Sequence, residues 1–318
     1  MADVMKKATR ESYGEALAEL GAEYPQLVVL DAGLSKSTKT DVFKKKYPER
    51  FINCGIAEAN MMSIAAGLAS TGMIPFASSF AMFAAGRAFE QVRNSIGYPH
   101  LNVKIGATHA GISVGEDGAT HQCCEDIALM RAIPGMVILN PADHVEAKAA
   151  VRAAVEYNGP VYLRFGRLAV PVFNDPETYK FEIGKGVTLR DGKDITIIAT
   201  GLMVWEAIKA ADQLKEQGIN ARVINIHTIK PFDKELVVKA AKETGVVVTV
   251  EEHSVIGGLG EAVSSAICEE GVACGVVKIG VQDRFGVSGP AVEVLKAFGL
   301  DSENIISVAK DAMKKFKA

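Results

Sequence analysis

The sequence has few cysteines, no long apolar run and little net charge. Its 318 residues contain five cysteines, which form no Cys-x-x-Cys pair and no spacing typical of a metal site. Such a sparse, odd-numbered set is typical of reduced thiols, and we expect a cytoplasmic protein. An apolar run of membrane-spanning length and a signal peptide are both lacking. A net charge of −3 and a pI near 6.1 leave no excess of positive charge for nucleic acid or anionic lipid.

The composition is that of a globular protein, with 48% hydrophobic and 23% charged residues. The length exceeds what one hydrophobic core usually fills, so we expect two domains. Short apolar segments rich in β-branched residues alternate with segments of helical period, which predicts an α/β fold with a mainly parallel sheet. Residues 171–186 break this alternation with proline, asparagine, aspartate and glycine. We therefore predict a first domain over residues 1–170, a linker over 171–186 and a second domain over 187–318.

The expected elements follow this division. In the first domain the expected strands are 27–30, 74–78, 102–107, 136–139 and 161–164, and the expected helices are 58–69, 84–96 and 144–156. Asp143, followed by Glu146 three residues later, predicts an N-terminal cap for the last of these helices. In the second domain we expect strands at 195–199, 223–226, 246–251 and near 276–279, and helices from about 203, after 231, near 291–298 and near 302–316.

Two motifs have ordinary explanations. Residues 111–115 match Gly-x-Ser-x-Gly, the pattern of a hydrolase nucleophile elbow, but that motif requires the serine to lead straight into a helix. Glu116, Asp117 and Gly118 follow instead, which disfavours a helix there and indicates a chance match. The glycines of residues 257–260 follow an expected strand and open a helix, so their amides could bind an anion. The motif is incomplete for a dinucleotide site, and close packing of strand against helix is the favoured interpretation.

The segment 108–122 is the strongest candidate for a site. It places two of the six histidines, two carboxylates and several glycines in a loop after an expected strand. Loops at strand ends are where open α/β sheets bind ligands, and clustered titratable groups favour function. The residues alone therefore predict a functional loop that contains His109, Asp117 and His121.

This loop resembles the G-E-D-G-x-T-H-Q signature of transketolases, which stands here as residues 115–122. Further segments match in the same order. Residues 54–61 resemble the G-I-x-E-x-x-M segment with the family's catalytic glutamate, residues 79–83 resemble its F-x-x-F segment, and residues 162–164 resemble the strand end with its phosphate-binding arginine. The family's G-D-G motif with a following asparagine, which holds the cofactor's diphosphate through a metal ion, has no counterpart. The chain thus resembles the C-terminal subunit of a split transketolase.

The resemblance implies a fold and a cofactor. The expected fold is a pyrimidine-binding domain followed by a transketolase C-terminal domain, and the expected cofactor is thiamine diphosphate, which carries the difficult chemistry. Glu58 is the residue expected to bind the aminopyrimidine nitrogen N1′ and to assist catalysis. Phe80 and Phe83 are expected to stack on the pyrimidine ring. At the place of a further family aromatic this chain has Gly86.

The resemblance also implies a reaction, the transfer of a two-carbon ketol unit between sugar phosphates of the pentose phosphate pathway. His109 and His121 are expected to move protons and to bind the sugar, and Asp117 to accept a bond from a sugar hydroxyl. Arg164 is expected to bind the substrate phosphate, with Arg167 as a competitor for that role. Ala110 and Gly111 depart from the usual family residues, which bears on sugar specificity.

A partner chain is implied by the missing diphosphate motif. We expect an N-terminal transketolase subunit to supply the diphosphate site and the ligands of Mg²⁺ or Ca²⁺, with no metal ligand in this chain, in a heterotetramer. The competing interpretations are the β-subunit of a 2-oxoacid dehydrogenase's decarboxylating component, a deoxyxylulose-phosphate-synthase-like subunit, a non-catalytic binding subunit, and an acyl-transfer hydrolase through Ser113.

Overall fold

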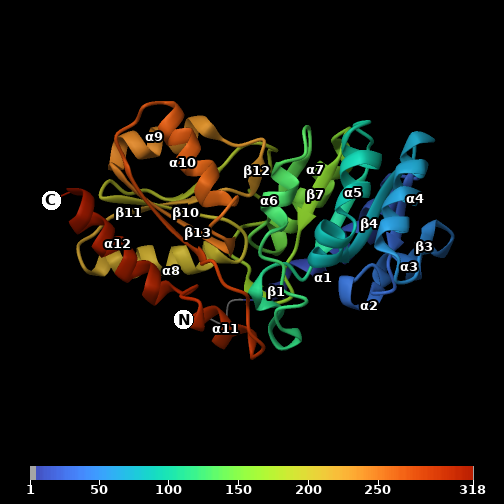
Figure 1. Cartoon of the computed structure of the whole chain (residues 1–318), viewed down its shortest axis with the longest axis horizontal. Coiled ribbons are helices and arrows are strands. Elements are labelled where there is room, and N and C mark those ends of the chain that lie inside the picture. Colours follow the sequence, from blue (N-terminus) through green and yellow to red (C-terminus); the bar gives the residue numbers. More distant parts are fainter. Residues whose placement is uncertain (1–4, 318) are drawn as a thin grey trace.

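The computed structural model describes residues 5–317, which form two α/β units side by side, each a sheet covered by helices (Figure 1). The first sheet has the strand order β12-β6-β7-β5-β4-β2-β3. In that order its strands are Thr228–Lys230, Val137–Leu139, Val161–Arg164, Lys104–Thr108, Ile74–Phe80, Leu27–Asp31 and Phe51–Asn53. All neighbours pair in parallel except β12, which joins β6 in antiparallel fashion. The carboxyl ends of β2, β4, β5 and β7 therefore meet at one edge.

Helices cover both faces of this sheet, because successive strand side chains point to opposite sides. Leu27 and Val29 of β2 pack with α1 (Thr9–Glu23) and α7 (His144–Glu156), whereas Val28 and Leu30 pack with α4 (Glu58–Ser70) and α6 (Asp126–Arg131). The expected cap of α7 is confirmed, since the Asp143 carboxylate accepts a bond from the Glu146 amide at 2.9 Å.

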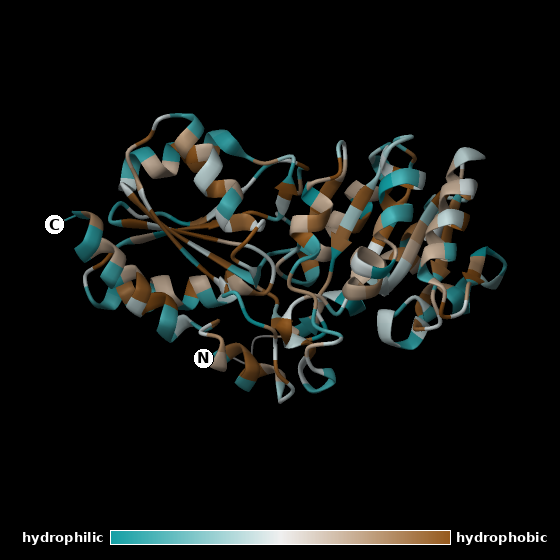
Figure 2. Cartoon of the chain, in the orientation of Figure 1, coloured by the Kyte–Doolittle hydropathy of each residue, from teal (hydrophilic) through white to brown (hydrophobic). Residues whose placement is uncertain are grey.

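The second sheet has the order β14-β13-β10-β11-β9. Its strands, in that order, are Gly275–Val281, Val246–Ser254, Ile195–Ala199, Ala221–Asn225 and Val187–Arg190. Helices α8 (Met203–Glu216) and α12 (Ser302–Lys317) cover one face, and α9 (Lys234–Thr244) and α10 (Leu259–Glu269) cover the other. Figure 2 shows hydrophobic colour along the central strands and hydrophilic colour on the outer faces of the helices. The expected α/β class is confirmed.

Smaller elements complete the chain. They are β1 (Lys6–Ala8), which pairs with β8 (Ala169–Pro171), the short helices α2 (Ser35–Thr38), α3 (Asp41–Lys46), η1 (Pro48–Arg50) and η4 (Ile112–Asp117), and α11 (Ala291–Ala297). No helix within residues 5–317 is both long enough and apolar enough to cross a membrane. No group of three or more histidine, cysteine or acidic side chains in this described part is arranged to hold a metal ion.

Two departures from the expected elements matter for the site. The helix expected over residues 84–96 is instead two π-helical turns, η2 (Met82–Arg87) and η3 (Val92–Gly97), joined by α5 (Phe89–Gln91). Such π-helical turns are frequent at functional sites. The second departure is β12, which lies in the second half of the chain but extends the first sheet. The two halves therefore share a sheet as well as a linker.

Candidate active site

Glu58 lies at the carboxyl edge of the first sheet, as the first residue of α4. Its side chain is only 1% exposed. It accepts a hydrogen bond from Arg87 Nη1 at 2.8 Å and a longer one from Ser79 Oγ at 3.3 Å. Ser79 belongs to β4 and Arg87 ends η2, so three elements meet at one buried carboxylate. A buried carboxylate with few donors is a group that a ligand N–H can satisfy.

The two expected aromatic residues lie beside this carboxylate. Phe80 ends β4 and Phe83 lies in η2, and their rings stack with centroids 5.9 Å apart. The guanidinium of Arg87 lies over the Phe83 ring at 4.4 Å from its centroid. Glu58, Phe80 and Phe83, which the sequence predicts as cofactor-binding residues, are linked here through Ser79 and Arg87, and the sequence argument did not identify Arg87.

His109 follows β5 and stacks on Phe80, with ring centroids 3.8 Å apart. Its backbone is left-handed at φ +57°, an uncommon conformation for a residue with a side chain and one that clusters at functional sites. The ring is bonded on both nitrogens, to Thr108 Oγ1 at Nδ1 and to Arg10 Nη1 at Nε2. Burial lowers the pKa of His109 to about 3, helped by the charges of Arg10 and Arg167 and by His121. His109 is therefore a neutral imidazole whose Nε2 accepts.

The loop with the G-E-D-G-x-T-H-Q residues continues from η4 past the same aromatic pair. His121 meets Phe83 edge to face at 5.4 Å between ring centroids, and its Nδ1 is 2.9 Å from Thr120 Oγ1. Asp117 is exposed to solvent at the end of η4. His121 thus packs against the aromatic pair, and Asp117 is an exposed residue of the same loop. We name the set Glu58, Phe80, Phe83, Arg87, His109 and His121 the Glu58 corner.

Arg164 lies elsewhere than a phosphate-binding role requires. Its side chain is 4% exposed and forms an ion pair with the fully buried Asp126 at 2.8 Å. Its Nη2 donates to the carbonyl oxygen of Glu252 at 2.9 Å, in the second domain. A guanidinium that is buried and bonded in this way is held by partners within the chain, so its surroundings do not favour the phosphate-binding role predicted for Arg164.

Arg167 and Arg10 are the cations that border the loop and His109. Arg167 donates to the Glu116 carboxylate at 2.7 Å and to the Val114 carbonyl, and its side chain is 36% exposed. Arg10 is in α1 and donates to Ser37 O and to His109. Sequence reasoning missed Arg10, because its partner lies 99 residues away and no local pattern links the two.

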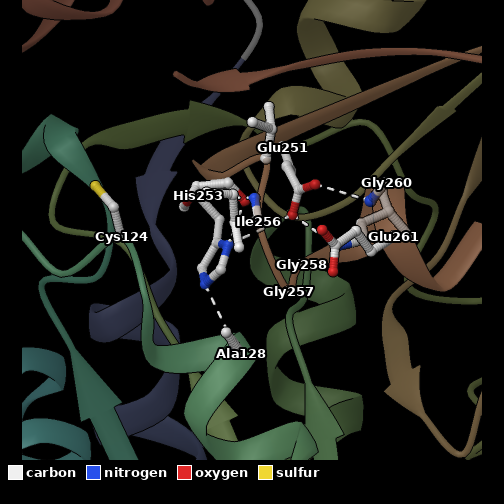
Figure 3. A network of polar contacts seen from close by, with 12 residues as sticks. Cys124, Ala128, Glu251, His253, Ile256, Gly257, Gly258, Gly260 and Glu261 are labelled. Carbon is white, nitrogen blue, oxygen red and sulfur yellow. Dashed lines mark hydrogen bonds and ion pairs between the residues drawn. The ribbon is translucent and has the colours of Figure 1, made fainter. Parts of the chain in front are cut away.

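A second polar cluster joins the domains behind the sheet edge. Its members are Asp126, Arg164, Glu251, Glu252 and His253, all buried, and we name it the junction. Figure 3 shows that the Glu251 carboxylate meets the start of α10, where the amides of Leu259 and Gly260 donate to it at 2.7 and 2.8 Å. The amides of Leu259 and Gly260 therefore bind a carboxyl group from within the chain, and close packing of strand and helix is confirmed, because a Cβ at Gly258 would collide with Glu251.

His253 completes this junction. Its Nδ1 donates to the Ser254 carbonyl at 2.7 Å, and its Nε2 faces the Ala128 amide at 3.4 Å (Figure 3). Burial lowers the pKa of His253 to about 4, so the ring is neutral in the folded protein. The amide of Ser113 donates to Glu252 at 2.6 Å, and the Ser113 side chain is 1% exposed. A serine enclosed in this way is no nucleophile elbow, which agrees with a chance match of Gly-x-Ser-x-Gly.

Comparison with known families gives a match for each half of the chain. Residues 5–172 match the pyrimidine binding domain of transketolase, and residues 184–305 match the transketolase C-terminal domain. The chain belongs to the transketolase family, and its two domains are those of the C-terminal part of such an enzyme.

Individual relatives agree with this assignment. A Methanocaldococcus jannaschii protein, provisionally described as a transketolase C-terminal section, is 55% identical over 97% of both chains. A Clostridium sp. (strain MSTE9) protein described as a 6-deoxy-6-sulfo-D-fructose transketolase subunit is 42% identical over 96% of this chain and 94% of its own. A solved structure titled as a split gene transketolase, an inactive β4 tetramer, is 54% identical with a TM-score of 0.90, over 96% of this chain and 98% of its own. The expected family and the split organisation are confirmed.

Proposed function

We propose that this chain is the catalytic half of a thiamine-diphosphate-dependent ketol transferase that acts only when a partner chain completes its site. The observation that carries the proposal is the Glu58 corner, in which a buried carboxylate and the stacked rings of Phe80 and the partly exposed Phe83 lie at the carboxyl edge of the sheet. The interpretation as a 2-oxoacid dehydrogenase subunit is not favoured, because the relatives over the whole chain are transketolase subunits.

The residues of the corner fit the pyrimidine end of the cofactor. A flat guanidinium already hydrogen-bonds Glu58 and stacks on Phe83, so the same corner accepts a planar group with N–H donors. When bound, thiamine diphosphate supplies the carbon nucleophile for making and breaking carbon–carbon bonds. Glu58 would hold the N1′ nitrogen, while Phe80 and Phe83 would enclose the ring and exclude water from it.

The histidines are assigned different tasks by their surroundings. His109 is neutral and its Nε2 already accepts from Arg10, so we assign it to orient a substrate oxygen through the Arg10–His109 pair. His121 is partly exposed and meets the corner through its edge, so we assign it to proton transfer at the sugar hydroxyls. Asp117, on the exposed side of the loop, is assigned to a donor-sugar hydroxyl.

Phosphate binding is assigned to Arg167 rather than Arg164. Arg167 is partly exposed beside the loop, and its carboxylate partner Glu116 is itself 63% exposed. Such a surface pair exchanges partners at little cost, because exposed ion pairs contribute only about 0.2–1 kcal/mol. Arg10 and Arg167 both act electrostatically on His109, so the two cations lie near one another. Together they suit an anionic group, whether a phosphate dianion or the singly charged sulfonate of the sulfosugar that the Clostridium relative's description names.

The partner is proposed to be an N-terminal transketolase subunit. It would supply the diphosphate site together with the ligands of Mg²⁺ or Ca²⁺, since residues 5–317 hold no group of side chains arranged for a metal. The similar solved chain is described as a split gene product and as inactive in its β4 form, which supports dependence on a second chain. We expect two copies of each chain in the active assembly.

Ketol transfer between xylulose 5-phosphate and ribose 5-phosphate tests the proposal. The chain alone, the chain with its co-purifying partner, and each sample without thiamine diphosphate are compared in the presence of Mg²⁺. Activity only in the complex and only with the cofactor is expected. Decarboxylation of a 2-oxoacid without sugar transfer would contradict the proposal. Replacing ribose 5-phosphate by other aldose acceptors then defines the substrate.

A further inference from the structure

We propose that Arg87 occupies the place of the cofactor's aminopyrimidine in the separate chain and must leave when the site is loaded. The inference rests on the proposed function, because it takes Glu58 and Phe83 as the pyrimidine-binding residues. Its basis is that one side chain covers both of them. The guanidinium donates to the Glu58 carboxylate at 2.8 Å and lies over the Phe83 ring at 4.4 Å.

The two halves of this ion pair differ in their exposure. The Glu58 side chain is 1% exposed, whereas the Arg87 side chain is 50% exposed. Moving the Arg87 side chain outward therefore costs little free energy, because half of this side chain is already in water. The Glu58 side chain cannot move outward in the same way, because it is buried and Glu58 is the first residue of α4. Arg87 is thus the mobile partner and Glu58 the fixed one.

Without Arg87 the Glu58 carboxylate would keep a single long bond, from Ser79 Oγ at 3.3 Å. A buried carboxylate with so little compensation is unfavourable, so the separate chain needs a second donor there. Arg87 supplies this donor until a ligand N–H replaces it. A guanidinium on an aromatic face also shares with an aminopyrimidine a planar shape and N–H donors.

The backbone of η2 places Arg87 in this position. Residues four apart lie almost above one another in a π-helical turn, and Phe83 and Arg87 have this spacing. Arg87 ends the π-helical turn, and Ala88 follows it with non-helical dihedrals before α5 begins. The side chain therefore projects from the end of an irregular segment. Cofactor binding would compete with Arg87, which lowers the apparent affinity by the fraction of chains in which Glu58 is free.

The test is the affinity of the complex of this chain and its partner for thiamine diphosphate, measured by titration calorimetry at saturating Mg²⁺. Arg87→Ala is compared with Arg93→Ala, a control in η3 whose exposed arginine bonds only to its neighbour Asn94. We expect Arg87→Ala to tighten binding about 3- to 30-fold, the combined size of an ion pair whose arginine is half-exposed and a cation–π contact. Arg87→Lys keeps the charge but lacks the planar guanidinium, and its affinity for the cofactor is expected to lie between those of the wild type and Arg87→Ala.

Thermal unfolding supplies a second readout. Arg87→Ala is expected to lower the Tm of the separate chain, because Glu58 loses its donor, and to leave the Tm of the cofactor-loaded complex within error of wild type. Unchanged or weaker cofactor binding in Arg87→Ala overturns the inference alone, provided that the wild-type complex binds thiamine diphosphate. Failure of the wild-type complex to bind it overturns the proposed function and this inference together.

Discussion

The Glu58 corner and the junction are both clusters of ionisable side chains, yet they differ in where their hydrogen bonds go. In the junction the carboxyl groups bond to buried partners within the chain: Arg164 pairs with Asp126, the Leu259 amide donates to Glu251 and the Ser113 amide donates to Glu252, although Asp126 Oδ1 has no hydrogen-bond partner among the described residues. In the corner the carboxylate is bonded by one half-exposed arginine and, at 3.3 Å, by Ser79, and Phe83 and His121 are partly exposed while Phe80 is buried. Clustering of charge therefore does not identify a site. A buried carboxylate at an accessible edge, whose main hydrogen-bond partner is half-exposed, does.

The largest expected effect is a loss of ketol-transfer activity when Glu58 of the corner is replaced. Glu58→Gln in the assembled complex should lower ketol transfer by about 10²–10⁴-fold, because the carboxylate that assists proton transfer is lost. Its unfolding free energy should change little, since glutamine fills the same space. Steady-state rates and urea unfolding of the same sample measure both quantities. The control is Glu235→Gln, an exposed glutamate in the first turn of α9, which should retain wild-type rates.

The second prediction concerns the junction. Arg164→Met leaves Asp126 as an unpaired buried charge and should lower the unfolding free energy by about 3–5 kcal/mol. Arg190→Met, which removes an exposed pair with Asp212, should lower it by at most about 1 kcal/mol. Denaturant titration compares the two variants, with Asp126→Asn as a milder substitution in the same pair. An Arg164→Met chain of wild-type stability that fails only with phosphorylated sugars would restore the phosphate role to Arg164.

A smaller effect is expected from Arg167. Arg167→Ala should raise the KM for a phosphorylated acceptor about 10- to 100-fold, the loss of one charge-assisted bond of about 1.5–3 kcal/mol, with little change in kcat. An unphosphorylated acceptor should show no such increase. Arg152→Ala, an exposed arginine paired with Glu23 far from the loop, serves as the matched control. Equal losses with both kinds of acceptor would argue against phosphate recognition by Arg167.

The smallest effect depends on pH and concerns a second buried contact between the domains. Burial raises the pKa of Glu146 to about 7, although Tyr179, the Ala142 amide and Asn225 donate to it. Between about pH 4.5 and 7 the folded chain keeps this proton and the unfolded chain loses it, so the contribution of Glu146 to stability falls as pH rises. Glu146→Gln cannot titrate, so its destabilisation relative to wild type should be greater at pH 5 than at pH 8.

Chemical unfolding of wild type and Glu146→Gln at pH 5, 6, 7 and 8 measures this difference. Glu156→Gln, at the exposed end of the same helix, should show the same difference from wild type at every pH. A Glu146→Gln deficit that is the same from pH 5 to pH 8 would mean that the carboxyl is ionised in the folded protein throughout this range.

Much of the fold could be predicted from the sequence, because its elements have strong local patterns. The strands β7 and β10 and the helix α7 have the expected bounds. Apolar residues recur at most of the positions that these elements bury. The two π-helical turns were not predicted, because residues 82–97 have an ordinary helical composition and one extra residue per turn leaves no mark in it. Nor was β12, since its pairing with β6 joins segments about 90 residues apart.

The site divides in the same way. Glu58, Phe80, His109 and His121 were predictable because they fall in contiguous motifs, and Asp117 lies on the same loop. Arg87 and Arg10 were not predictable, since each depends on a contact between distant segments, and the choice between Arg164 and Arg167, both named from the sequence, stays a prediction. Arg164 and Arg167 differ by three residues in sequence, yet one is 4% and the other 36% exposed. Only the end of β7 and the turn after it decide which of the two reaches the loop.

Binding of thiamine diphosphate tests the central claim most directly, namely that the Glu58 corner is half of a site. Calorimetric titration with Mg²⁺ present is carried out on this chain alone, on its partner alone and on the equimolar mixture. The account predicts saturable binding in the mixture, at one cofactor for each copy of this chain, and at most weak binding to either component. Tight binding to this chain alone, or binding by the mixture that Glu58→Ala leaves unchanged, would contradict it.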